Sequence, residues 1–138
     1  MSFYEFLEMK FCKIYRKKNE KINEALEIFG ISSSLSILLV NISRTPGLTQ
    51  NQLKDFLNLD KTTISKSLKS LEEKQLIEKF IDTTDKRSFR IFPSTKGKKM
   101  SQDIKVILEE NWKNELSTLS SEELKIFDNI LDKILYNL

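Results

Sequence analysis

The chain has 138 residues, the size of one compact domain, and 39% of them are hydrophobic, which is enough to build a core. The chain contains one cysteine, which excludes an intrachain disulfide, and no histidine, which excludes a Ser-His or Cys-His catalytic pair. With only 3 glycines, a glycine-rich phosphate loop is not expected. One cysteine with scattered carboxylates does not make a transition-metal site either, and we therefore expect no enzyme activity, no cofactor and no metal.

Positive charge is concentrated in the middle of the chain, although the net charge is only +3. Residues 44–99 carry thirteen basic and seven acidic side chains, whereas residues 100–138 carry four basic and eight acidic ones. Such clustering is typical of a protein that binds a polyanion. A solvated lysine-rich surface would give the same counts, so charge alone does not decide the function.

The N-terminal residues show no targeting signal. They have neither a basic start nor a long apolar run, and no segment of the chain approaches the 18 or so apolar residues of a membrane span. We expect a cytoplasmic protein without a membrane partner.

The first elements are two predicted helices. Apolar residues recur at helical spacing from Phe3 to Phe29, and Gly30 is a good position for the helix to end. Ser32 or Ser33 can cap a second helix, which ends at the Thr45-Pro46-Gly47 sequence.

A pair of short helices follows. Thr49 and Gln52 form a capping-box pattern that opens the first, in which we expect Leu53, Phe56 and Leu57 to point inward. After a turn at residues 58–60, Asp60 caps the second helix, whose inward stripe is Ile64, Leu68 and Leu71. The opposite, outer face of the second helix carries hydroxyl and ammonium groups that suit bases and phosphates, and our candidates are Thr62, Thr63, Ser65, Lys66 and Lys69.

Two alternating segments, 76–81 and 88–93, predict a β-hairpin with a polar tip at residues 82–87. Because a proline cannot donate to a ladder, the second strand should end at Pro93 or lie on an edge. Six basic residues and no acidic residue lie in the segment from Lys86 to Lys99, which favours a contact strip. Ser94 then caps a long helix, and Ser120 or Ser121 starts the last one. The predicted fold is mainly α with a small β-wing, a winged helix-turn-helix.

The segments Leu48–Leu53, Leu57–Ser65, Leu68–Ile77, Asp85–Arg87 and Ser94–Gly97 resemble the MarR family of bacterial winged-helix transcription regulators. In place of the family's Leu-Thr-x-x-Gly helix start the chain has Pro93-Ser94-x-x-Gly97. The resemblance implies a single domain over residues 1–138, with a winged-helix core at 33–97 and dimerisation helices at 1–29 and 98–138. It also implies a homodimer whose two winged helices bind the halves of a palindromic operator in double-stranded DNA.

The same resemblance implies roles for the wing. Arg87 would reach into the minor groove, where narrow A·T tracts concentrate negative potential. Asp85 would orient its guanidinium or cap the loop, and Lys86 and Arg90 would contact phosphates. The alternative is a solvent-exposed hairpin tip whose charges only keep the protein soluble.

We therefore predict a homodimeric, sequence-specific DNA-binding transcription regulator, a repressor that responds to a small-molecule effector. Two alternatives stay open: a thiol-redox regulator that senses oxidants through Cys12, and a winged-helix module that binds a protein and no specific DNA. Tyr4, Tyr15 and Trp112 are candidates for an effector pocket, although core or interface positions explain these aromatic residues better.

Overall fold

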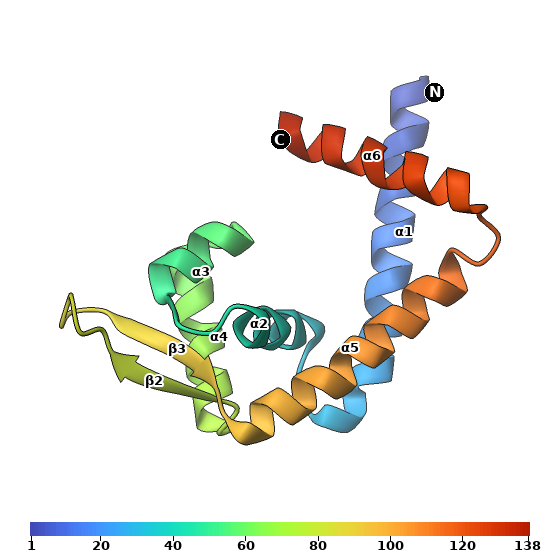
Figure 1. Ribbon diagram of the computed structural model, residues 1–138. Coiled ribbons are helices and arrows are strands. Elements are labelled where there is room, and N and C mark those ends of the chain that lie inside the picture. Colours follow the sequence, from blue (N-terminus) through green and yellow to red (C-terminus); the bar gives the residue numbers. More distant parts are fainter. The chain divides into compact units, whose positions relative to one another are not determined.

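The computed structural model describes residues 1–138, which form two compact units, Met1–Ile107 and Leu108–Leu138 (Figure 1). The boundary between the units falls within a helix. In chain order the elements are α1 (Phe3–Leu26), the 3₁₀ helix η1 (Glu27–Phe29), α2 (Ser33–Arg44), β1 (Leu48–Thr49), α3 (Gln50–Leu57), α4 (Lys61–Glu73), β2 (Ile77–Ile81), β3 (Phe89–Pro93), α5 (Thr95–Glu115) and α6 (Ser121–Asn137). The predicted fold, mainly α with a small wing, is confirmed.

The core of the first unit is built around α2. This helix contacts α1, α4 and β3, and its Leu38, Leu39 and Ile42 side chains are at most 2% exposed. A helix that packs against neighbours on several sides has to be apolar on several sides, which explains its run of leucine, isoleucine and valine. The rest of the core comes from the neighbouring elements and includes Leu26, Leu53, Ile64, Leu68, Leu71, Ile91 and Ile104.

The helices begin and end where the sequence predicts. Ser32, Thr49, Asp60 and Ser120 are N-caps, and Thr49 makes the full capping box: its Oγ1 accepts the Gln52 N–H at 3.2 Å, while Gln52 Oε1 accepts the Thr49 N–H at 2.9 Å. The first helical segment ends at Gly30, which adopts φ 68°. Only its last three residues differ from the prediction, because they form a 3₁₀ turn.

The sheet has three antiparallel strands in the order β1-β3-β2. Strands β2 and β3 form the predicted hairpin, paired from Ile77 opposite Pro93 to Ile81 opposite Phe89, and β3 ends at Pro93 as expected. Strand β1, which pairs Leu48 with Ile91, was not predicted. Two residues are too short to show the alternation by which a strand is recognised in a sequence.

The prediction for one core residue of α3 is wrong. Phe56 was expected to point inward, but its side chain is 67% exposed, whereas Leu53 in the same helix is fully buried. Leu53 is the one buried residue of the eight in helix α3, and Leu57 is half-buried, so the face that reaches the core is narrower than the apolar stripe of the sequence.

The terminal helices carry large exposed apolar side chains. In α1, Phe3, Phe6, Phe11 and Ile14 are at least 50% exposed, and α6 has no buried residue at all. No helix is by itself long and apolar enough to cross a membrane; the bent pair Phe3–Phe29 with Ser33–Arg44 meets that test by length and composition only.

Candidate nucleic-acid interface

Helix α4 presents a polar face to solvent and an apolar face to the core. Ile64, Leu68 and Leu71 are fully buried, as predicted. The other side of the helix is open, and all five candidate contact residues on it are exposed: Thr62, Thr63, Ser65, Lys66 and Lys69. The structure therefore brings these hydroxyl and ammonium groups onto one accessible surface, and their contact with DNA stays a prediction.

The start of α4 is held by the turn that precedes it. Asn58 adopts a left-handed conformation with φ 55°, and the Leu59 N–H donates to the Lys54 carbonyl at 3.0 Å. Asp60 Oδ1 accepts the Thr63 N–H at 2.7 Å, and this bond is the main reason why the pKa of the Asp60 carboxyl lies below its usual value. The cap stays charged at neutral pH and complements the positive end of the helix dipole.

A side-chain hydrogen bond ties the two helices of the helix-turn-helix together. Gln50 Nε2, at the start of α3, donates to Ser65 Oγ in α4 at 2.7 Å. Because the serine oxygen accepts this bond, its own O–H remains a donor that can point to a base edge or a phosphate. Gln50 is not among the predicted site residues, since no spacing rule pairs residues fifteen positions apart on different helices.

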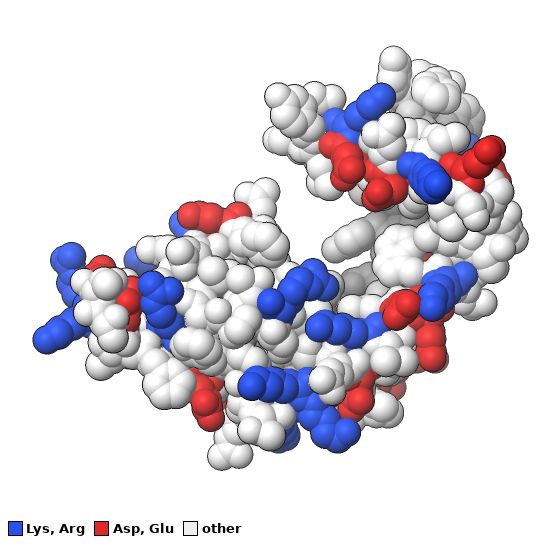
Figure 2. All heavy atoms as spheres, in the orientation of Figure 1, with Lys and Arg blue, Asp and Glu red and all other residues white.

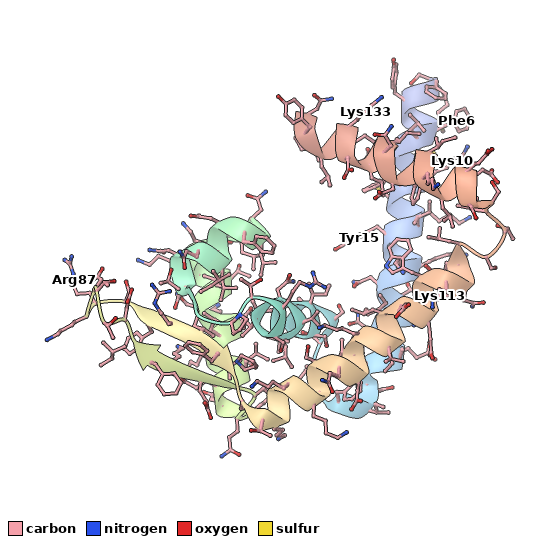
Figure 3. The ribbon with its side chains drawn as sticks, viewed as in Figure 1. Phe6, Lys10, Tyr15, Arg87, Lys113 and Lys133 are labelled. Atoms are coloured by element: carbon pink, nitrogen blue, oxygen red, sulfur yellow. The ribbon has the colours of Figure 1, made fainter.

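The tip of the wing is a closed turn that carries one exposed arginine. The Asp82 N–H donates to the Ser88 carbonyl at 2.9 Å and closes the hairpin. Asp85 Oδ1 accepts the Arg87 backbone N–H at 3.0 Å and lies 3.5 Å from Arg87 Nε, so Asp85 both caps the loop and faces the guanidinium. The Arg87 side chain is 94% exposed and projects from the far end of the wing (Figure 3).

Arg90 and Asp82 form an ion pair that stabilises the wing. Arg90 Nη1 donates to the Gly47 carbonyl at 2.8 Å, and its Nε lies 3.3 Å from Asp82 Oδ1. Asp82 is only 5% exposed, and the Thr84 backbone N–H, followed by the Thr84 hydroxyl and Arg90, lowers the pKa of its carboxyl. The predicted phosphate contact of Arg90 stays a prediction, but two of its donors are already bound within the chain. The hairpin register places Asp82 and Arg90 diagonally across the two strands. A predicted register would therefore have indicated this ion pair from the sequence.

The sequence predicts a contact strip from the basic run between Lys86 and Lys99, but the structure divides this run between two places. Lys86 and Arg87 lie at the wing tip, whereas Lys96, Lys98 and Lys99 lie in the first turns of α5. The register places the tip beyond the Ile81–Phe89 pair and α5 beyond the Ile77–Pro93 pair, so the two groups flank opposite ends of the strands. Basic side chains gather at the outer end of the wing in Figure 2, and this group is the candidate contact surface.

Cys12 has surroundings that disfavour a reactive thiol. Its Sγ lies 3.4 Å from Glu8 Oε1, and the hydrogen bond to this carboxylate is the main reason why the pKa of the thiol is raised. The thiolate is the form that reacts with oxidants, so a raised pKa lowers reactivity. The geometry therefore gives no support to the redox alternative.

The aromatic candidates for an effector pocket belong to different units. Tyr4 and Tyr15 lie on α1, and their side chains are 78% and 65% exposed (Tyr15 in Figure 3). Trp112 lines a depression within the second unit together with Lys113, Leu116 and Leu124. A shared pocket stays a prediction. No group of three or more acidic, cysteine or histidine side chains could hold a metal ion.

Comparisons with known proteins agree with this architecture. The sequence model of the MarR family matches residues 31–89. The chain is 30% identical over 102 residues to an uncharacterised HTH-type transcriptional regulator, YybA, of Bacillus subtilis, covering 74% of this chain and 68% of that protein. Among solved structures it is similar to S. aureus MepR in a complex with DNA (TM-score 0.85, 28% identity, 100% and 99% of the two chains). It is also similar to a putative MarR-family regulator of Listeria monocytogenes complexed with a 26mer DNA (TM-score 0.87, 26% identity, 94% and 86%).

Proposed function

The chain belongs to the MarR family, and on that basis we propose that it is a homodimeric, cytoplasmic transcription repressor that binds a palindromic operator and responds to a small molecule. The observation that carries the proposal is the pairing of an exposed hydroxyl- and ammonium-bearing face on α4 with a capped wing that holds Arg87 in solvent. Helix α4 would lie in the major groove and the wing tip in the neighbouring minor groove. The similarity of the chain to MepR and to the Listeria regulator, both of which were solved in complex with DNA, supports DNA binding by this fold.

Dimerisation is supported by the unpartnered apolar surface of the terminal helices, residues 1–29 and 98–138. Phe3, Phe6 and Phe11 of α1 and Ile130 and Ile134 of α6 are 48–69% exposed in the isolated chain. Monomeric proteins rarely leave so many large apolar side chains in water. A two-fold dimer would bury them and would also present two α4 helices to half-sites about one helical turn apart, roughly 10 bp.

Effector control would follow from differential binding. A ligand that binds the free dimer more tightly than the DNA-bound dimer must, by linkage, weaken operator binding by the same factor. The depression beside Trp112 is one place where an apolar molecule could dock, since Leu116, Leu119 and Leu124 also line it. Release of the operator would then free the promoter for transcription.

The test is salt-dependent binding of the dimer to the DNA upstream of its own gene, with wild type beside Arg87→Ala. Each phosphate or groove contact made by a cation contributes to the slope of log K against log salt. We expect Arg87→Ala to cost about 1–3 kcal/mol and to lower that slope by about one charge. The matched control is Arg16→Ala, because Arg16 is an exposed arginine on α1, away from the wing, and its loss changes the net charge equally.

The outcomes separate the candidate functions. Tight, sequence-selective binding that Arg87→Ala weakens and Arg16→Ala preserves supports the operator-binding repressor. Weak binding that is equal on random DNA and indifferent to Arg87 contradicts it and favours the protein-interaction alternative. The dimer mass of both variants is measured beside wild type, so that a lost dimer is not mistaken for a lost DNA contact.

A further inference from the structure

The wing carries an exposed apolar pair that neither the core nor the basic tip explains. Ile81 and Phe89 lie directly opposite each other in the last ladder pair before the loop. Their side chains are 61% and 47% exposed. Leaving both in water forfeits the free energy that burial would give, at roughly 25 cal/mol for each Å² of apolar surface.

The position of the pair in the sheet shows which way it faces. Side chains alternate along a strand, so Ile81 and Phe89 share a face with Ile77, Ile91 and Pro93. Those three are buried at the root of the wing, on the side where α4 packs against β2. The apolar pair is therefore the outward continuation of the core-facing side of the sheet, beyond the residues that the core buries.

The charged side chains near Ile81 and Phe89 indicate what kind of surface this apolar pair could contact. Lys79 lies on the same face one pair further in, and Lys86 and Arg87 follow in the tip. The nearby carboxylates are paired or lie on the opposite face: Asp85 faces the Arg87 guanidinium, Asp82 is buried against Arg90, and Glu78 lies on the other side of the sheet. A small apolar patch with Lys79 on one side and the basic tip on the other fits a surface that is both anionic and partly apolar.

We propose that Ile81 and Phe89 contact the deoxyribose edges of the DNA strand that runs between the major groove, where α4 would lie, and the minor groove, where Arg87 would lie. The inference rests on the proposed function and deepens it. Sugar C–H groups offer the apolar surface, and the phosphates on either side of each sugar offer the negative charge to Lys79 and Lys86. Proteins that bind the minor groove frequently place apolar side chains in it, which shows that such residues can contact DNA there.

The test uses a duplex that the wild-type protein selects from a random-sequence library. We expect Phe89→Thr and Ile81→Thr to weaken binding on the order of 5- to 10-fold, with the salt slope unchanged because no charge is removed. Threonine keeps the strand propensity of both positions. The matched control is Phe80→Thr, since Phe80 is 54% exposed on the neighbouring position of β2 but faces the other side of the sheet, and we expect it to bind as wild type does.

Hydroxyl-radical footprinting provides a second readout, because it reports which deoxyriboses are shielded. We expect the wild type to protect sugars beside the wing and Phe89→Thr to lose that protection while the protection beneath α4 persists. Wild-type affinity and footprint in Phe89→Thr, or an equal loss in Phe80→Thr, would overturn this inference and leave the proposed function standing. If the wild type selects no duplex at all, the proposed function and this inference fall together.

Discussion

Gly97 sets how closely α5 approaches the root of the wing, and replacing it with alanine tests that closeness. A Cβ atom at this position would lie 2.0 Å from the Leu76 carbonyl oxygen and 3.4 Å from Leu39 Cδ1. Unstrained non-bonded contacts between heavy atoms lie near 3.5 Å, so the start of α5 would have to move by more than about 1 Å. The same movement would strain the hydrogen bond from Ser94 N to the Leu76 carbonyl, which measures 3.0 Å.

The expected cost follows from three terms. Overpacking of this kind costs about 1–3 kcal/mol, and the weakened hydrogen bond adds about 1 kcal/mol. Alanine returns about 1 kcal/mol, because it is the better helix former. We therefore expect Gly97→Ala to lower the free energy of unfolding by about 1–3 kcal/mol.

Urea unfolding followed by circular dichroism, at one protein concentration for all variants, measures this change. The matched control is Lys98→Ala in the same helix turn, whose exposed side chain makes the expected change less than about 0.5 kcal/mol. A neutral or stabilising Gly97→Ala would refute the reasoning, because helix propensity alone predicts that sign.

Three further predictions concern association, pH and oxidation. Phe6→Asp places a charge on the exposed apolar face of α1, and light scattering should show the dimer shifting toward the monomer; an unchanged dimer would place the interface elsewhere. The pKa of Asp82 is lowered, first by the Thr84 N–H, so its stabilising contribution is complete above the unfolded value of about 3.9 and is lost as the pH falls through the lower folded value. Asp82→Asn should therefore be less stable than wild type at pH 7 and converge with it on acidification, and a constant difference down to pH 2 would contradict this cause. Peroxide should leave operator binding unchanged in wild type and Cys12→Ser alike, because Glu8 raises the pKa of the thiol; a loss confined to wild type would restore the redox alternative.

Much of the fold was predictable because its signals are local. Thr49 with Gln52 and Asp60 with Thr63 are caps made within one helical turn, and they appear at the predicted positions. The buried stripe of α4 follows from helical periodicity alone. The prediction that Phe56 points inward was wrong because periodicity indicates which residues share a face of a helix, and not how much of that face the core buries.

The candidate site divides in the same way. The sequence by itself determined the exposed face of α4, the hairpin and the position of Arg87 at its tip, since each depends on residues close together in the chain. Only the tertiary structure decided that Arg90 binds the Gly47 carbonyl and that Gln50 holds Ser65, because these partners meet through folding and no spacing rule connects them. It also divided the basic run between the two ends of the wing and left Ile81 and Phe89 exposed, since burial depends on how far along the strands the packed core extends.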